Sequence, residues 1–133
     1  MKAKYKEYAD ANSKFLEENA QQPNIKVLPC GVQYRVIKEG EGPTPTAQSI
    51  VQVFYKGKMI NGKQFDSNLG DGFPAVFRVR EVITGWQEAL KQMSVGSKWE
   101  IFIPAHLGYG GESAGIIKKY STLIFEVELV GIS

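Results

Sequence analysis

Histidine and cysteine are almost absent from this chain, which has one residue of each among its 133. The lone Cys30 excludes a disulfide within the chain, and a nucleophilic thiol would also need a partner base. His106 has neither a second histidine nor a C-x-x-C pair with which to form a zinc site. A Ser-His-acid triad would have to recruit His106 without a G-x-S-x-G segment. We therefore expect an incidental thiol and a surface or loop histidine.

The glycine-rich segment 108–115, GYGGESAG, also lacks the residues of a nucleotide site. It has neither the G-x-G-x-x-G spacing nor the Lys-Ser/Thr pair of a phosphate-binding loop, so we expect a mobile loop. The sequence therefore shows no set of catalytic residues for hydrolysis, phosphoryl transfer or redox chemistry.

Charge and hydropathy argue against two classes of partner. Sixteen basic and 14 acidic residues give a net charge of +2, without the clustered basic face that nucleic-acid binding normally needs. No apolar run is long enough to cross a membrane, and no leader with an apolar core is visible. We expect a cytoplasmic location for the chain as it stands, or a periplasmic one if a leader has been removed.

Residues 2–20 predict an N-terminal helix that ends before Pro23. Its apolar stripe is narrow, so we expect the helix either to pack loosely or to mediate association. The stripe consists of Tyr5, Tyr8, Phe15 and Leu16. We place the boundary to the main domain near residue 30, with a helix and linker over 1–30 and the main domain over 31–133.

Alternating apolar and polar residues predict strands over most of the remainder. The predicted strands are NIKVL (24–28), VQYRVI (32–37), SIVQVFYKGKMI (49–60), KQFD (63–66), AVFRV (75–79), KWEIFI (98–103) and STLIFEVELVGI (121–132). Asn61-Gly62 predicts a hairpin between the third and fourth of these. The pattern indicates an α+β domain, an antiparallel sheet with one short helix packed on its core face.

That short helix begins within EVITGWQEAL, residues 81–90. Thr84 and Gln87 have the spacing of a capping box, and Gly96 stands where a C-terminal stop is expected. Trp86 opens an apolar face that continues through Ala89, Leu90 and Met93. The largest apolar side chain thus lies in the first turn, beside backbone N–H groups without intrahelical partners.

Several aromatic residues are predicted to converge near this helix start. Tyr55, Phe77 and Phe125 occupy the inward faces of their strands, and Phe65-Asp66 ends the return strand of the hairpin. Singly, each is more typical of a core than of a site. Together they predict an apolar cup with a few polar groups at its edge.

These same segments resemble the FKBP-type peptidyl-prolyl cis–trans isomerases. The similarity runs from about Gly31 to the C-terminus and rests on GKQFDSN, VITGW, LGYGG and STLIFEVEL, in the order and spacing of that family. The N-terminal helix with LPCGVQYRVIKEGEGPTPT resembles the linker region of the bacterial Mip-like branch. The resemblance implies a five- or six-stranded antiparallel half-barrel wrapped on one helix, with a proline pocket between them.

The resemblance also implies the residues of that pocket. Trp86 would be the floor, and the amide N–H of Ile83 would donate to a substrate carbonyl. The walls would be Tyr55, Phe65, Phe77, Val82, Ile83, Ile117 and Phe125. The polar rim would be Asp66 and Tyr109. No cofactor and no metal are implied.

The implied activity is isomerisation of X–Pro bonds in protein substrates, assisting protein folding by desolvating and stabilising the twisted amide. The alternative is a non-catalytic proline-peptide binding or chaperone module. The implied partners are proline-containing polypeptides and macrolide inhibitors of the rapamycin class, with homodimerisation through the N-terminal region left open.

Two departures from the family concern the pocket surroundings. Asp71 falls near where some members carry an arginine that pairs with the pocket aspartate, so Asp66 is expected to find another partner. Lys118-Lys119 stand where many relatives have two prolines, which bears on the shape of the late loop and on substrate preference.

Overall fold

The structure, a computed structural model, describes residues 3–133, and the side chains of residues 3 and 4 lie outside this description. The first residue of the predicted 2–20 helix also lies outside the described residues. The described elements, in chain order, are α1 (Ala3–Asn19), β1 (Lys26–Val27), β2 (Gln33–Lys38), β3 (Ile50–Lys58), β4 (Gln64–Ser67), β5 (Ala75–Arg78), the 3-10 helix η1 (Val79–Glu81), α2 (Thr84–Leu90), β6 (Lys98–Ile103), the 3-10 helix η2 (Ala105–Leu107) and β7 (Leu123–Ile132).

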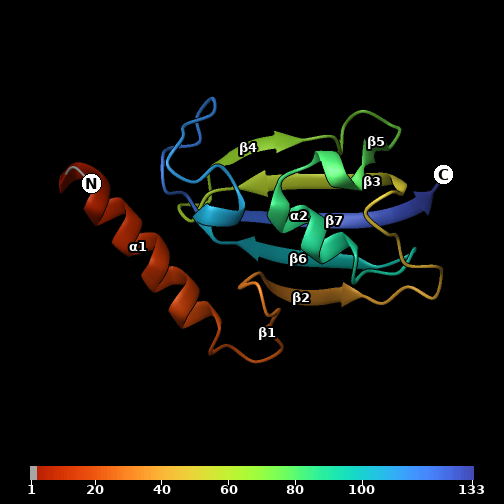
Figure 1. The fold of residues 1–133 in the computed structure, drawn as a ribbon, viewed down its shortest axis with the longest axis horizontal. Helices are drawn as coiled ribbons and strands as arrows, with labels where there is room; N and C mark the ends of the chain where they lie inside the picture. The colour runs from red at the N-terminus through yellow and green to blue at the C-terminus, as the bar shows by residue number, and fades with distance from the viewer. Residues whose placement is uncertain (1–2) are drawn as a thin grey trace.

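Within residues 3–133 the strands form one antiparallel sheet of seven, in the order β1-β2-β6-β7-β3-β4, with β5 pairing to β3. The predicted α+β class is therefore confirmed. The sheet exceeds the implied five or six strands because it includes the two-residue β1. β7 lies in its middle, between β6 and β3 (Figure 1).

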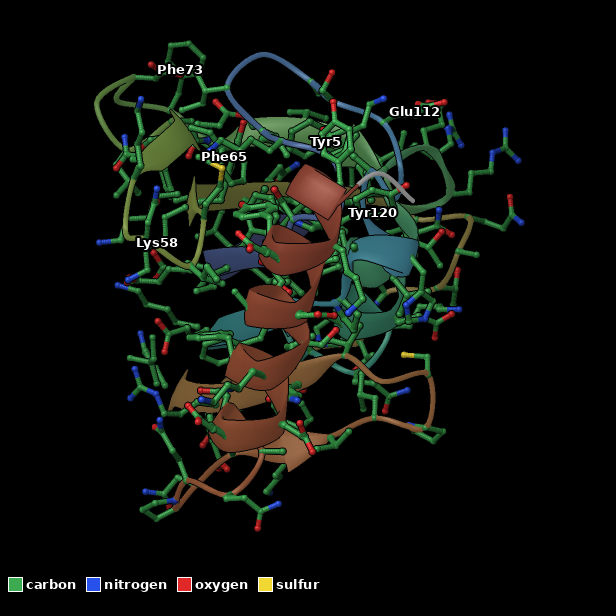
Figure 2. All side chains as sticks on the ribbon, turned by 90° about the vertical axis from the view of Figure 1, so that its left-hand side faces the viewer. Tyr5, Lys58, Phe65, Phe73, Glu112 and Tyr120 are labelled. Carbon is green, nitrogen blue, oxygen red and sulfur yellow. The ribbon has the colours of Figure 1, made fainter. Side chains whose placement is uncertain are left out.

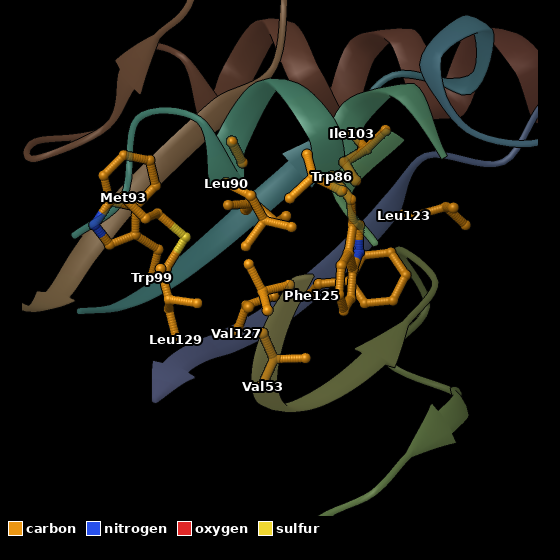
Figure 3. Packing of buried hydrophobic residues seen from close by; sticks show 14 of the residues in the cluster. Val53, Trp86, Leu90, Met93, Trp99, Ile103, Leu123, Phe125, Val127 and Leu129 are labelled. Carbon is orange, nitrogen blue, oxygen red and sulfur yellow. The ribbon is translucent and has the colours of Figure 1, made fainter. Parts of the chain in front are cut away.

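The hydrophobic core lies between the sheet and α2 (Figure 3). Strand residues two apart point to the same face, so β7 contributes alternate residues to the core, including Leu123, Phe125 and Leu129, each at most 5% exposed. The predicted helix face is buried as well. Gly85 allows the close approach of α2 to β6, because a Cβ atom there would overlap the side chain of Ile103.

The predicted hairpin joins β3 to β4. Gly62 has a φ of +87°, a left-handed conformation that glycine adopts without strain. Its N–H donates to the carbonyl of Met59 at 2.9 Å, and the Asn61 side-chain oxygen accepts from the N–H of Lys63, also at 2.9 Å. This turn places Asp66 opposite Gly57 of β3.

α1 lies at one end of the sheet, next to the loop that follows η2 (Figures 1 and 2). Its Phe15 ring lies 6.2 Å from that of Phe102 on β6. Two buried asparagines, Asn12 and Asn19, also face the domain and are 3% and 5% exposed. The apolar stripe predicted for this helix therefore packs on the main domain, with buried polar residues between its apolar ones.

The structure leaves the proposed boundary near residue 30 untested. β1 precedes that position and pairs with β2, which follows it.

None of the helices in the described residues has the length and apolarity needed to cross a membrane.

Candidate functional site

A pocket of about 250 Å³ opens where the start of α2 faces β3, β4, β5 and β7. Its lining residues come from six separate segments of the chain. They are Tyr55, Asp66, Phe77, Glu81, Val82, Ile83, Trp86, Tyr109 and Phe125. Eight of the ten predicted site residues are among them, so the fold brings together residues that lie up to 70 positions apart in the sequence.

The ring of Trp86 is the centre of an aromatic box. It meets three rings edge-to-face: Tyr55 at 5.2 Å between centroids and 84°, Phe77 at 5.7 Å and 85°, and Phe125 at 5.2 Å and 90°. The perpendicular geometry is favourable because the positive edge of one ring meets the negative face of another. Trp86 and Phe125 are seen side by side in Figure 3. The box therefore holds its rings in fixed orientations.

Trp86 is buried more deeply than expected for a residue that forms the open floor of a pocket. Only 4% of the residue is exposed, so most of its ring belongs to the core and a small part lines the pocket. Its indole Nε1 is also the one buried side-chain nitrogen or oxygen without a hydrogen-bond partner among the described residues. Such a group costs about 1–3 kcal/mol relative to a satisfied one, so the indole occupies this position at an energetic disadvantage.

The polar rim is organised around Tyr55. Its hydroxyl donates to Oδ2 of Asp66 at 2.8 Å, and the other carboxylate oxygen of Asp66 accepts from the N–H of Ser67 at 2.9 Å. Asp66 thus finds its partner in a wall residue, as Asp71 supplies no positive charge. Burial raises the pKa of Tyr55 to about 12, with further contributions from the hydrogen bond to Asp66 and from the negative charges of Asp66 and Asp71.

The predicted capping box at the start of α2 is wrong. The N-cap residue is Ile83, which makes no side-chain capping hydrogen bond. The Gln87 side chain donates instead to the carbonyls of Val82 at 2.7 Å and Arg80 at 3.3 Å. The side chain of Gln87 therefore fixes the segment that enters the helix and does not cap an amide.

This arrangement leaves the first amides of α2 without side-chain acceptors. The carbonyl of Ile83 accepts from the N–H groups of Trp86 and Gln87, whereas the N–H of Ile83 donates to no acceptor in the described part of the chain. A ligand carbonyl at the pocket mouth would be the natural acceptor for such a group. The Trp86 side chain and this amide come from the same turn.

Two predicted site residues do not line the pocket. Phe65 lies behind Phe125, with centroids 5.4 Å apart and ring planes at 87°, and Ile117 is 5% exposed within the core cluster. Phe65 therefore packs against a residue of the pocket wall, and Ile117 belongs to the core. Gly57 allows the contact between the two phenylalanine rings, because a Cβ atom there would lie 2.6 Å from Cε1 of Phe125 and 2.7 Å from Cζ of Phe65.

One residue of the pocket lining was not predicted from the sequence. Glu81 is the exposed last residue of η1, directly before Val82, and its position next to a predicted wall residue was the only signal for it. Cys30 and His106 are not part of the pocket lining. Within residues 3–133, no group of three or more His, Cys, Asp or Glu side chains is placed to hold a metal ion.

Comparison with known proteins identifies the family. Residues 42–130 match the family described as FKBP-type peptidyl-prolyl cis-trans isomerase, and residues 1–36 match the domain amino-terminal to it. The chain belongs to the FKBP family. The resemblance that the sequence motifs indicated is thereby confirmed.

Individual FKBP relatives cover nearly the whole chain. The chain is 51% identical over 120 residues to the FKBP-type 22 kDa peptidyl-prolyl cis-trans isomerase of Escherichia coli K12, and 43% identical over 125 residues to the peptidyl-prolyl cis-trans isomerase Mip of Coxiella burnetii. These matches cover 90% and 93% of the chain but 58% and 54% of the relatives. The chain therefore spans little more than half the length of these two proteins.

Solved structures of FKBP-family proteins agree with the fold. A peptidyl-prolyl cis-trans isomerase of Pseudomonas syringae superposes with a TM-score of 0.92 at 35% identity, covering 100% of this chain and 98% of that one. FkpA of Escherichia coli gives 0.90 at 36% identity, covering 98% of this chain and 63% of its own. The similarity thus includes α1 as well as the sheet.

Proposed function

We propose that this FKBP-family chain is a peptidyl-prolyl cis–trans isomerase that accelerates rotation about X–Pro bonds in polypeptides and so assists their folding. The observation that carries the proposal is the aromatic box: a tryptophan ring met edge-to-face by three others, next to the N–H of Ile83, for which residues 3–133 supply no acceptor. Family membership points to the same chemistry. The ten site residues named from the sequence are proposed to hold or support the substrate proline.

Binding in this proposal divides between apolar and polar groups. The proline ring enters the apolar volume above Trp86, and the N–H of Ile83 donates to a substrate carbonyl next to the rotating X–Pro bond. Tyr109, 39% exposed, and the Tyr55–Asp66 pair contact the peptide at the rim. These few polar contacts orient the substrate peptide, and the aromatic walls exclude water from the pocket.

Catalysis then needs no nucleophile and no proton transfer. Resonance holds the X–Pro amide planar behind a barrier of about 18–20 kcal/mol, and the uncatalysed reaction takes tens to hundreds of seconds. The twisted amide has lost resonance and is less polar, so a dry pocket stabilises it relative to the planar forms. Each ~1.4 kcal/mol of such preference gives about tenfold in rate.

The protonation state of Tyr55 stays constant near neutral pH. Because the pKa of Tyr55 is raised to about 12, its hydroxyl remains protonated and remains a donor to Asp66 near neutral pH. We therefore expect the rate constant to change little between about pH 6 and 8.

The test is an isomerase assay on the purified chain with a proline-containing peptide, read by protease coupling or by exchange NMR. Acceleration that falls on titration with a macrolide of the rapamycin class, in competition with the peptide, is the expected result. A folded chain that binds the peptide without accelerating isomerisation would instead identify the non-catalytic binding module. A folded chain with neither property would refute the site assignment. Homodimerisation through the N-terminal region stays a prediction, to be measured by sedimentation.

A further inference from the structure

α1 holds three consecutive residues at the end of the late loop, which is the segment 108–122 between η2 and β7. The ring of Tyr5 lies 6.2 Å from that of Tyr120 at 63°, the hydroxyl of Tyr8 lies 2.9 Å from Oγ of Ser121, and Oδ1 of Asn12 accepts from the N–H of Thr122 at 2.7 Å. The three helix residues are spaced i, i+3 and i+7 and so share one face of α1. Figure 2 shows Tyr5 beside Tyr120 at the N-terminal end of the helix.

Hydrogen bonds on both sides orient this contact. The hydroxyl of Ser121 donates to the carbonyl of Lys118 at 2.7 Å, which favours Tyr8 as the donor to Ser121, and the Tyr8 hydroxyl also lies 4.0 Å from Sδ of Met59. The side-chain amide of Asn12 donates to the carbonyl of Tyr8 at 2.8 Å, which turns its oxygen toward Thr122. Asn12 and Thr122 are 3% and 1% exposed, so loss of the asparagine would leave a buried N–H without an acceptor.

The held segment is joined directly to the pocket rim. Tyr120 has a φ of +64°, a left-handed conformation that a non-glycine residue keeps only where its surroundings hold it. Its N–H donates to the carbonyl of Gly110 at 2.8 Å, and Gly110 directly follows Tyr109. A connection thus runs from the face of α1 through Tyr120 and Gly110 to a residue that lines the pocket.

We propose that Tyr8 and Asn12 of α1 are positioning residues for the proline pocket. By holding residues 120–122 they fix the loop that carries Tyr109, and the rim is displaced when they are lost. This inference rests on the proposed function of the pocket, since it concerns how that site binds its peptide. It assigns α1 a role in substrate binding in addition to its packing on the domain.

Asn12→Ala is the main test, and Asn19→Ala is its matched control. Asn19 is a second buried asparagine on the same face of α1, but its amide donates to the Gln33 side chain at the other end of the helix, at 2.8 Å. Each variant removes one buried amide from one helix, so the two share a structural cost. Only Asn12 touches the late loop.

The measurements are KM and kcat for a proline peptide, and amide hydrogen exchange at Tyr120. For Asn12→Ala we expect KM to rise about fivefold with kcat nearly unchanged, because a displaced rim weakens binding of ground and transition states alike. Amide exchange at Tyr120 should be about tenfold faster, because the hydrogen bond from its N–H to the carbonyl of Gly110 opens more often. For Asn19→Ala both quantities should stay within about twofold. A smaller folded fraction alone would lower kcat and leave KM unchanged.

Equal increases of KM in the two variants would overturn the inference, and so would an unchanged KM in Asn12→Ala. If that variant does not fold, Tyr8→Phe decides by the same criteria, because it removes only the hydroxyl that is hydrogen-bonded to Ser121. A wild-type chain without isomerase activity would refute the proposed catalysis instead. The dissociation constant of the proline peptide would then replace KM, with the same expected ratio between variants.

Discussion

Replacing Trp86 by leucine separates the two roles of its ring. Truncation of a buried aromatic residue to alanine costs about 3–5 kcal/mol, and Trp86, at 4% exposed, should show this full cost. Leucine keeps part of the apolar contact but loses three edge-to-face pairs, each worth about 0.5–1.5 kcal/mol. Removal of the unpartnered indole N–H recovers about 1–3 kcal/mol. We therefore expect Trp86→Leu to lower the free energy of unfolding by about 2 kcal/mol.

The effect on activity should be larger than this loss of stability explains. Without the flat ring the pocket loses its floor, and we expect the isomerase rate per folded molecule to fall at least about tenfold, equal to about 1.4 kcal/mol of transition-state stabilisation. The two quantities are measured on the same samples, by denaturant melts and by the peptide assay. Binding of a proline ligand should weaken in parallel.

Trp99→Leu provides the control. Trp99 is also buried in the core cluster, at 6% exposed, but it stacks on Tyr34 at 4.1 Å and does not line the pocket. We expect a comparable loss of stability with normal activity in the folded fraction. If Trp86→Leu behaves in this way too, Trp86 is only core and the pocket has been misplaced.

Three further predictions concern the pH dependence and single residues. Since the folded pKa of Tyr55, about 12, exceeds its ordinary value of 10.0, this group stabilises the fold below pH 10 and the contribution is lost as pH rises to 12; alkaline melts of Tyr55→Phe should show a smaller loss over that window. Cys30→Ser and His106→Ala should each keep the isomerase rate within about threefold, because no proton is transferred, and a hundredfold loss in a folded variant would contradict the mechanism. Gly57→Ala should lower both stability, by about 1–3 kcal/mol, and the affinity for proline ligands, because the new methyl group displaces the ring of Phe125; unchanged calorimetric binding would argue against the role assigned to this glycine.

The strands and the aromatic walls were predictable because both follow from the alternation of side chains. KWEIFI became β6 with the predicted bounds, Lys98–Ile103. The same alternation placed Tyr55, Phe77 and Phe125 on inward faces that meet at the pocket. The resemblance to the FKBP family added residues outside regular strands, such as Val82, whose place no periodicity could show.

The features that were missed depend on the backbone and on polar contacts. Thr84 has the residue type of a cap, but the helix begins with Ile83 as its N-cap because Gln87 is engaged with the preceding carbonyls. The polar contacts that hold α1 were not predictable, because an apolar stripe does not reveal buried asparagines such as Asn12. The left-handed conformation of Tyr120 has no sequence signature either, since a tyrosine is not a residue type that favours it, and its contacts are with Tyr5 and Gly110, which are not adjacent to it in the sequence.

The central place of β7 in the sheet has a consequence for how this chain is synthesised. β7 joins β3 to β6 and follows every other strand in the sequence. While residues 123–132 remain inside the ribosome, the earlier strands cannot be joined into one sheet, whatever follows them in the chain. We therefore expect folding to complete only after β7 has emerged, with the apolar faces of the earlier strands open to chaperones until then. A protein proposed to assist the folding of others would itself be exposed to misfolding until β7 is made.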